Sequence, residues 1–172
     1  MIKLVGALLV LLAGTLIGFL EAARYASRPR QIRQMIHALQ RLETEIGYGQ
    51  TPLPEALARL SGGLSAPLDG LLAEAAERLR APGGKMVSQI WEEVWSGGWD
   101  RTDMKAPERE TILRLGSTLG SSERADQLKH IRLAIQQLQA EEAAAREEQM
   151  RFEKMCRSLG ALGAALVVIV LL

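Results

Sequence analysis

Apolar residues are arranged in two ways along this chain: as uninterrupted runs at both ends and as a helical repeat between them. Residues 4–20 and residues 158–172 contain no formally charged side chain. At 1.5 Å per residue these runs span about 26 and 23 Å as helices, slightly short of the ~30 Å hydrocarbon core of a bilayer. Flanking residues can extend them, because an arginine such as Arg157 snorkels its charged head to the interface. We therefore expect transmembrane helices at residues 1–23 and 158–172.

Basic residues border the inner side of each run and predict the topology. They are Arg24, Arg28, Arg30 and Arg33 after the first run, and Lys154 and Arg157 before the second. Because Lys and Arg are retained on the cytoplasmic side, these residues are predicted to determine the topology, with residues 24–157 forming a cytoplasmic helical bundle. A cleaved signal peptide is the alternative for the first run, but the arginines that follow it would oppose translocation.

Between the runs, apolar residues recur every three or four positions, which is typical of amphipathic helices. Glycine and proline residues divide this pattern into segments at about 29–46, 53–60, 67–79, 87–95 and 107–115. Residues 122–157 contain neither and continue into the second apolar run as one long helix with a seven-residue repeat. The predicted fold class is all-α: a cytoplasmic antiparallel bundle of about six helices, flanked by N- and C-terminal transmembrane helices.

The long helix is predicted to pack antiparallel against the first amphipathic helix, which begins near Pro29, where proline suits a first turn. An 18-residue helix is about 27 Å long and a 36-residue helix about 54 Å. The turns at residues 47–53 and 116–120 therefore need not lie together, unless the first helix continues through Arg28.

Composition excludes several classes of function. With 172 residues and a net charge of +1, the chain has the length of one domain and no overall field that would attract nucleic acid. The single cysteine, Cys156, excludes an internal disulfide and a cysteine zinc cluster.

Motifs for catalysis are weak. The sequence Gly83-Gly84-Lys85 lacks the first glycine of a phosphate-binding loop, and Met86 replaces its Ser or Thr. The two histidines lie on different predicted helices without an acidic partner at metal-binding spacing. We expect no catalytic, cofactor-binding or metal-binding residues, no cofactor, and a protein that is not an enzyme.

Several residues are candidates for contacts with other chains. The candidate partner-binding residues are Gln50, Thr51, Pro52 and Ser117 in the turns, and Trp91, Trp95 and Trp99, which fall within nine residues. The alternatives are that glycines and prolines only shape the turns, and that the tryptophans belong to the core. Gly14 and Gly18, with Gly160 and Ala164 as a weaker counterpart, are candidates for close association of membrane helices.

Five segments resemble a known family, stage III sporulation protein AB. They are residues 28–34 (RPRQIRQ), 42–46 (LETEI), 48–53 (YGQTPL), 115–120 (LGSTLG) and 129–134 (KHIRLA). Residues 61–105 match only in their helical pattern. The family's cytoplasmic bundle is in turn similar to the inner-membrane platform proteins of type II secretion.

The resemblance implies a non-enzymatic membrane component of a sporulation channel complex, placed in the mother-cell membrane facing the engulfed forespore. It also implies other subunits of that complex as partners, including a secretion-type ATPase, and it leaves open a homo-oligomer. The alternative from the residues is a membrane-anchored helical signalling adaptor, although almost no residues lie outside the two runs to sense a signal. A membrane enzyme comes third.

Overall fold

The computed structural model describes the backbone of residues 2–48, 51–120 and 123–171, and the side chains of residues 25–48, 51–120 and 123–155. Over these residues the protein is all-helical, as predicted. Its elements are α1 (Ile2–Tyr48), α2 (Leu53–Ser61), α3 (Leu68–Arg80), α4 (Val87–Gly98), a 3-10 turn (Trp99–Arg101), α5 (Ala106–Gly116) and α6 (Arg124–Leu171).

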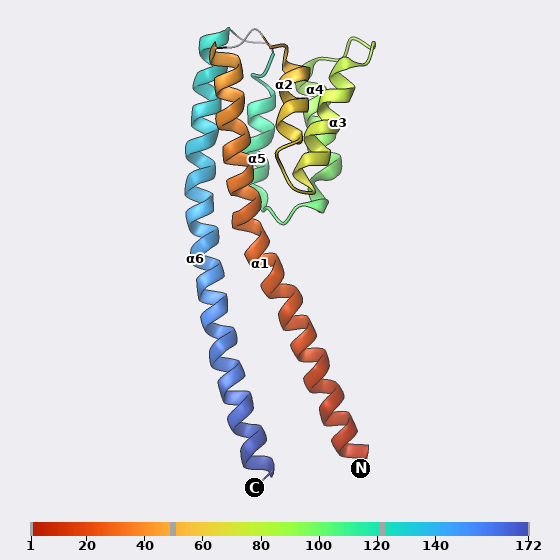
Figure 1. The fold of residues 1–172 in the computed structure, drawn as a ribbon, viewed down its shortest axis with the longest axis vertical. Coiled ribbons are helices and arrows are strands. Elements are labelled where there is room, and N and C mark those ends of the chain that lie inside the picture. Colours follow the sequence, from red (N-terminus) through yellow and green to blue (C-terminus); the bar gives the residue numbers. More distant parts are fainter. Residues whose placement is uncertain (1, 49–50, 121–122, 172) are drawn as a thin grey trace.

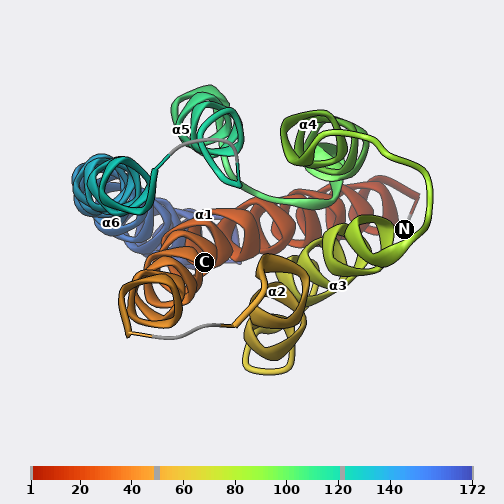
Figure 2. The ribbon, with the colours of Figure 1, turned by 90° about the horizontal axis from the view of Figure 1, so that it is seen from above.

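Two long helices form the frame of the molecule. α1 and α6 run antiparallel, and the four short helices gather at one end of this pair while both chain termini lie at the other (Figure 1). Each helix packs on the next along the chain, and α6 closes the ring against α1 (Figure 2). The bundle therefore has one core, enclosed by all six helices.

The contact between α1 and α6 follows the predicted seven-residue repeat. Ile131, Ile135, Leu138 and Ala145 of α6 are all buried, with exposed fractions of 7% or less. Because these positions recur every three or four residues, they form one stripe that faces the partner helix. The predicted antiparallel packing is confirmed.

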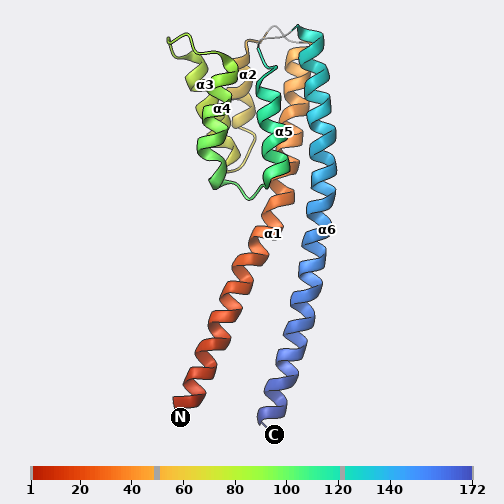
Figure 3. The ribbon, with the colours of Figure 1, turned by 180° about the vertical axis from the view of Figure 1, so that it is seen from behind.

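The start of the first helix differs from the prediction. Pro29 lies inside a continuous α1 and does not begin a new helix. A proline in a helix interior loses one backbone hydrogen bond and crowds the carbonyl four residues earlier, which favours a bend. Here the ring of Pro29 is buried in the bundle, so tertiary packing compensates the local cost. The N-terminal half of α1 diverges from α6, as seen from front and back (Figures 1 and 3).

The continuity of α1 answers the question of the two turns. Because α1 extends through Arg28, its C-terminal end reaches the start of α6. There the Arg124 Nε donates a hydrogen bond to the Ile46 carbonyl at 2.6 Å. The α1–α2 and α5–α6 connections consequently lie at the same end of the bundle (Figure 3).

Among residues whose side chains are described, no helix is long and apolar enough to cross a membrane. The apolar runs at residues 4–20 and 158–172, on which the two transmembrane predictions fall, lie outside that set. Over residues 4–20 and 158–171 the backbone is helical and continuous with the bundle helices.

Candidate functional site

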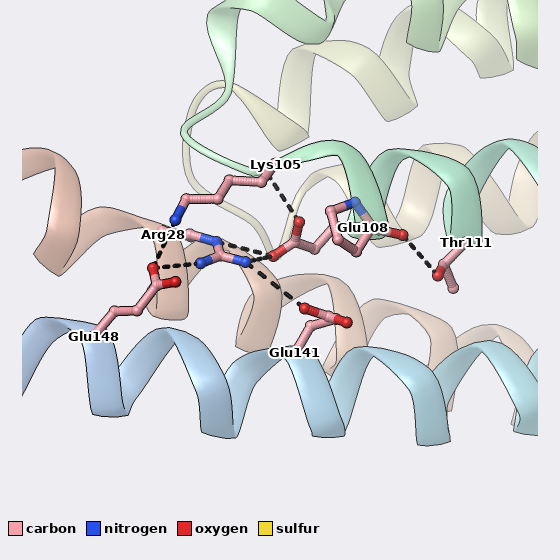
Figure 4. Close-up of polar contacts among 7 residues, drawn as sticks. Arg28, Lys105, Glu108, Thr111, Glu141 and Glu148 are labelled. Atoms are coloured by element: carbon pink, nitrogen blue, oxygen red, sulfur yellow. Dashed lines mark hydrogen bonds and ion pairs between the residues drawn. The ribbon is translucent and has the colours of Figure 1, made fainter.

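A buried arginine joins three helices at the end of the bundle from which α1 and α6 depart. Arg28 is only 5% exposed, and its guanidinium points from α1 toward α5 and α6 (Figure 4). Its Nε and Nη2 donate to Glu108 Oε1 at 2.9 and 2.6 Å. Its Nη1 donates to Glu148 Oε2 at 2.8 Å. One cation therefore binds an acid from α5 and an acid from α6.

Glu108 is the most enclosed acid of this cluster, with an exposed fraction of 0%. Glu108 lies in the first turn of α5, and its second oxygen accepts a hydrogen bond at 2.9 Å from the backbone N–H of Lys105, the residue before the helix. A carboxylate is favoured at a helix N-terminus, where unpaired N–H groups carry partial positive charge. Glu108 thus caps α5 and holds Arg28 with the same side chain.

Lys105 and two acids of α6 complete the cluster. The Lys105 ammonium donates to Glu148 Oε2 at 2.7 Å, and Glu141 lies 3.7 Å from Arg28 Nη2. The pKa of Glu148 is lowered from its ordinary value of 4.5, mainly by the hydrogen bond from Lys105 and also by the charges of Arg28 and Lys105, against an opposing effect of burial. Glu148 is therefore ionised at neutral pH. We call Arg28, Lys105, Glu108, Glu141 and Glu148 the basal cluster.

The loop before α5 is also tied to α1 beside the basal cluster. Asp103 Oδ2 accepts hydrogen bonds from Ser27 Oγ at 2.5 Å and from Gln31 Nε2 at 3.1 Å. Gln31 Oε1 accepts in return from the Asp103 backbone N–H at 2.9 Å. Together, these contacts and the basal cluster hold α1 against α5 and α6 at the point where α1 leaves the bundle. The arrangement is suited to holding helices together.

Two open hollows flank the basal cluster. The larger, of about 430 Å³, is lined by the 3-10 turn and the loop before α5, including Asp100 and Asp103. The smaller, of about 290 Å³, lies between α6 and the start of α5. Tyr25 and Lys105 line both hollows. Among the side chains that the structure describes, no group of three or more His, Cys, Asp or Glu is placed to hold a metal ion.

Two of the three candidate tryptophans are core residues, which corrects the expectation that they bind a partner. Trp91 and Trp95 are 1% and 0% exposed. The Trp91 Nε1 donates to the Ile112 carbonyl at 2.8 Å, so its one polar atom is satisfied inside the bundle. Trp99 is half-buried, with its ring centroid 6.3 Å from that of Trp95. Trp91 and Trp95 are close in the sequence because both lie on the buried face of one helix, where large aromatic side chains fill the core.

The candidate turn residues lie at the opposite end from the basal cluster. Pro52 and Ser117 are exposed, while Thr51 is half-buried and donates to Glu45 Oε2 at 2.9 Å. Gln50 lies outside the described residues. The structure adds an exposed apolar side chain that sequence reasoning missed, Tyr48, which is 93% exposed at the end of α1. We call this end of the bundle, formed by the α1–α2, α3–α4 and α5–α6 connections, the distal surface.

The residues predicted to set topology have different surroundings. Arg28 is buried in the basal cluster, whereas Arg30 and Lys154 are exposed. Arg33 is exposed and binds Glu142 at 2.6 Å. Six further candidates lie outside the residues with described side chains: Gly14, Gly18, Arg24, Arg157, Gly160 and Ala164.

Comparisons with known proteins agree on one family. The model of a family described as stage III sporulation protein AB matches residues 3–172. Stage III sporulation protein AB of Bacillus subtilis (strain 168) is 40% identical over 172 residues, which cover 100% of both chains. A solved structure of stage III sporulation protein AB is 39% identical and superposes with a TM-score of 0.68, covering 73% of this chain and 98% of that one.

Proposed function

Because the chain belongs to the stage III sporulation protein AB family, a family of sporulation proteins, we propose that it is a non-enzymatic membrane component of a sporulation secretion or channel complex. In this proposal the complex lies between mother cell and forespore, and the chain is its platform or docking subunit for a cytoplasmic ATPase. The platform role extends the resemblance to the inner-membrane platform proteins of type II secretion.

The observation that carries this proposal is that α1 and α6 leave the bundle at the same end (Figure 1). Each helix continues into one of the uncharged runs, at residues 4–20 and 158–172. A bundle anchored in this way stands on one face of a bilayer, with the basic residues near its base on the cytoplasmic side. The basal cluster then acts as the brace that keeps both anchors aligned with the bundle.

The distal surface is the part of the chain that this arrangement offers to a cytoplasmic partner. Tyr48 and Met86 are 93% and 65% exposed there, although large apolar side chains usually lie inside. Pro52 and Ser117 are exposed on neighbouring connections. Aromatic and methionine side chains are enriched where protein interfaces form. An ATPase that works beneath the membrane would meet this surface first.

Topology is tested by a reporter fusion. Alkaline phosphatase, which folds only outside the cytoplasm, is fused after Gln50, so that it follows the native first apolar run. We expect no phosphatase activity, because the fusion point lies in the cytoplasmic bundle. A β-galactosidase fusion at the same point should be active, and the reverse pattern of the two reporters would refute the topology. A fluorescent fusion in sporulating cells should in addition mark the mother-cell membrane around the forespore.

Docking is tested by placing a charge on the distal surface. Ser117→Arg and Gln50→Arg should reduce recovery of the sporulation ATPase with the full chain from detergent extracts, without lowering the melting temperature. Ser96→Arg is the matched control, because Ser96 is also exposed but lies on α4, away from the connections. Equal recovery of ATPase with all three variants would exclude these turns as the docking site.

A further inference from the structure

The smaller hollow lies where both long helices leave the bundle. Its walls are Tyr25 of α1, Lys105 at the start of α5, and Glu148, Arg151, Phe152 and Met155 of α6. Tyr25 follows the first apolar run by five residues, and Met155 precedes the second by three. At 1.5 Å per residue, the hollow is within about 8 Å of each run along its helix. In the proposed topology it opens at the level of lipid headgroups.

The hollow combines an apolar side with a cationic side. Tyr25 and Phe152 stack with ring centroids 4.5 Å apart and planes at 20°, and Met155 beside them is 50% exposed. Aromatic side chains with this placement are typical of the interface between membrane and water. The Lys105 ammonium and the Arg151 guanidinium supply N–H donors that suit a phosphate group.

The charge balance within the hollow leaves these donors available. Its one carboxylate, Glu148, already accepts a hydrogen bond from Arg28 Nη1 at 2.8 Å, in addition to the bond from Lys105. Because an ammonium carries three donors, Lys105 keeps others for a ligand. Arg151 pairs with Glu147 at 3.4 Å, and both side chains are more than 70% exposed. Such an exposed pair is weak and readily exchanged.

The larger hollow is less suited to the same ligand. Asp100 and Asp103 line it together with Arg28 and Lys105, so its two carboxylates offset its two cations, and a phosphate gains no net attraction there. A volume of about 290 Å³ for the smaller hollow lies at the lower end of ligand pockets. It is therefore suited to a headgroup with the first part of an acyl chain, and a whole lipid would extend out of it into the bilayer.

We propose that the smaller hollow binds the phosphate of an anionic phospholipid, with Lys105 and Arg151 as donors and with Phe152 and Met155 against the first carbons of the lipid. This inference rests on the membrane anchoring put forward above. Bound there, the lipid bridges α5 and α6 beside the basal cluster. It thereby stabilises the junction between the bundle and its anchors.

The test uses the full chain in nanodiscs of phosphatidylcholine with or without phosphatidylglycerol. Phosphatidylglycerol should raise the melting temperature and remain bound in native mass spectra. Arg151→Gln should weaken its retention by more than about tenfold, because a charge-assisted hydrogen bond is lost. Lys154→Gln is the matched control: Lys154 is an exposed cation on the same helix but does not line the hollow. Lys154→Gln should weaken the retention of phosphatidylglycerol by no more than the roughly fivefold expected for any basic residue near an anionic surface.

Each other outcome counts against the site. Equal losses with Arg151→Gln and Lys154→Gln would show general attraction to the membrane surface and would overturn the site. The same stabilisation by inorganic phosphate in pure phosphatidylcholine discs would replace the lipid by a free anion. Stable insertion into discs without any preference for phosphatidylglycerol would refute the site and leave the anchoring intact. Failure of the chain to insert would refute the anchoring as well.

Discussion

Replacing Arg28 with alanine should cause a large loss of stability, because it removes the cation that faces a fully buried acid. Glu108 has an exposed side-chain fraction of 0% and accepts two hydrogen bonds from Arg28. Without Arg28, Glu108 would keep the hydrogen bond from the Lys105 backbone N–H but would have lost its counter-ion. A buried charge left in this way costs about 3–5 kcal/mol, because it has lost both its hydration and its counter-ion.

The stability lost in Arg28→Ala should be much larger than that lost when an exposed ion pair on the same helix is broken. Arg33 binds Glu142 at 2.6 Å, the same distance as Arg28 to Glu108, but its side chain is 47% exposed. Exposed pairs contribute about 0–1 kcal/mol. For a chain of this length about 2–4 °C of melting temperature corresponds to each kcal/mol. We expect a fall of roughly 6–20 °C for Arg28→Ala and of less than about 4 °C for Arg33→Ala.

The assay is thermal unfolding of the full chain in detergent, followed by far-ultraviolet circular dichroism. A double variant, Arg28→Met with Glu108→Leu, adds a second readout. Replacing both members of a buried pair by apolar groups removes the stranded charge, so most of the lost stability should return. If Arg28→Ala lowers the melting temperature no more than Arg33→Ala does, the basal cluster is not the brace that we infer.

Two further predictions concern packing and pH. Gly116→Ala should destabilise the bundle by about 1–3 kcal/mol, because the added Cβ would lie 2.1 Å from the Trp91 ring. Gly70→Ala is the control: its added Cβ would have no neighbour within 4 Å, so it should be neutral or stabilising by up to about 1 kcal/mol. Chemical denaturation measures both free energies of unfolding. Because the pKa of Glu148 is lower in the folded than in the unfolded chain, ionised Glu148 stabilises the fold above its unfolded pKa, and this stability is lost as the pH falls through its folded pKa. Lys105→Gln should raise the folded pKa toward 4.5 and shift the acid loss of stability to higher pH. Carboxyl NMR titration measures this pKa.

The helices of the bundle could be predicted from the sequence because their signals are local. Glycine and proline residues mark the ends of the short helices, and a three-and-four spacing of apolar residues defines the buried face of α6. Ile131 and Leu138, both 0% exposed, are where that spacing predicts them. The buried stripe of one helix also restricts its partner, so the antiparallel packing of α1 and α6 followed from two local patterns.

The basal cluster could not be predicted, because its contacts join residues that are far apart in the sequence. Arg28 lies 80 positions from Glu108 and 120 from Glu148. From sequence alone Arg28 is one of several arginines beside an apolar run, and charge near a membrane segment indicates topology. Pro29 was misleading for a related reason. Proline at a first turn and proline inside a buried helix look alike until the tertiary packing around them is known.

The continuity of α1 determines how far the distal surface stands from the proposed membrane. If the first helix began at Pro29, its 18 residues would reach only about 27 Å and leave its turn well below the start of α6. With α1 continuous from the end of its apolar run to Tyr48, the 28 residues reach about 42 Å, against about 51 Å for the 34 residues of α6 from Arg124 to residue 157. Arg28 lies a little over a quarter of the way along this distance on α1, near the base, where a tilt of the helix would displace the distal surface most. A brace at that position fixes the height and the orientation of the surface together, which is what a docking subunit requires.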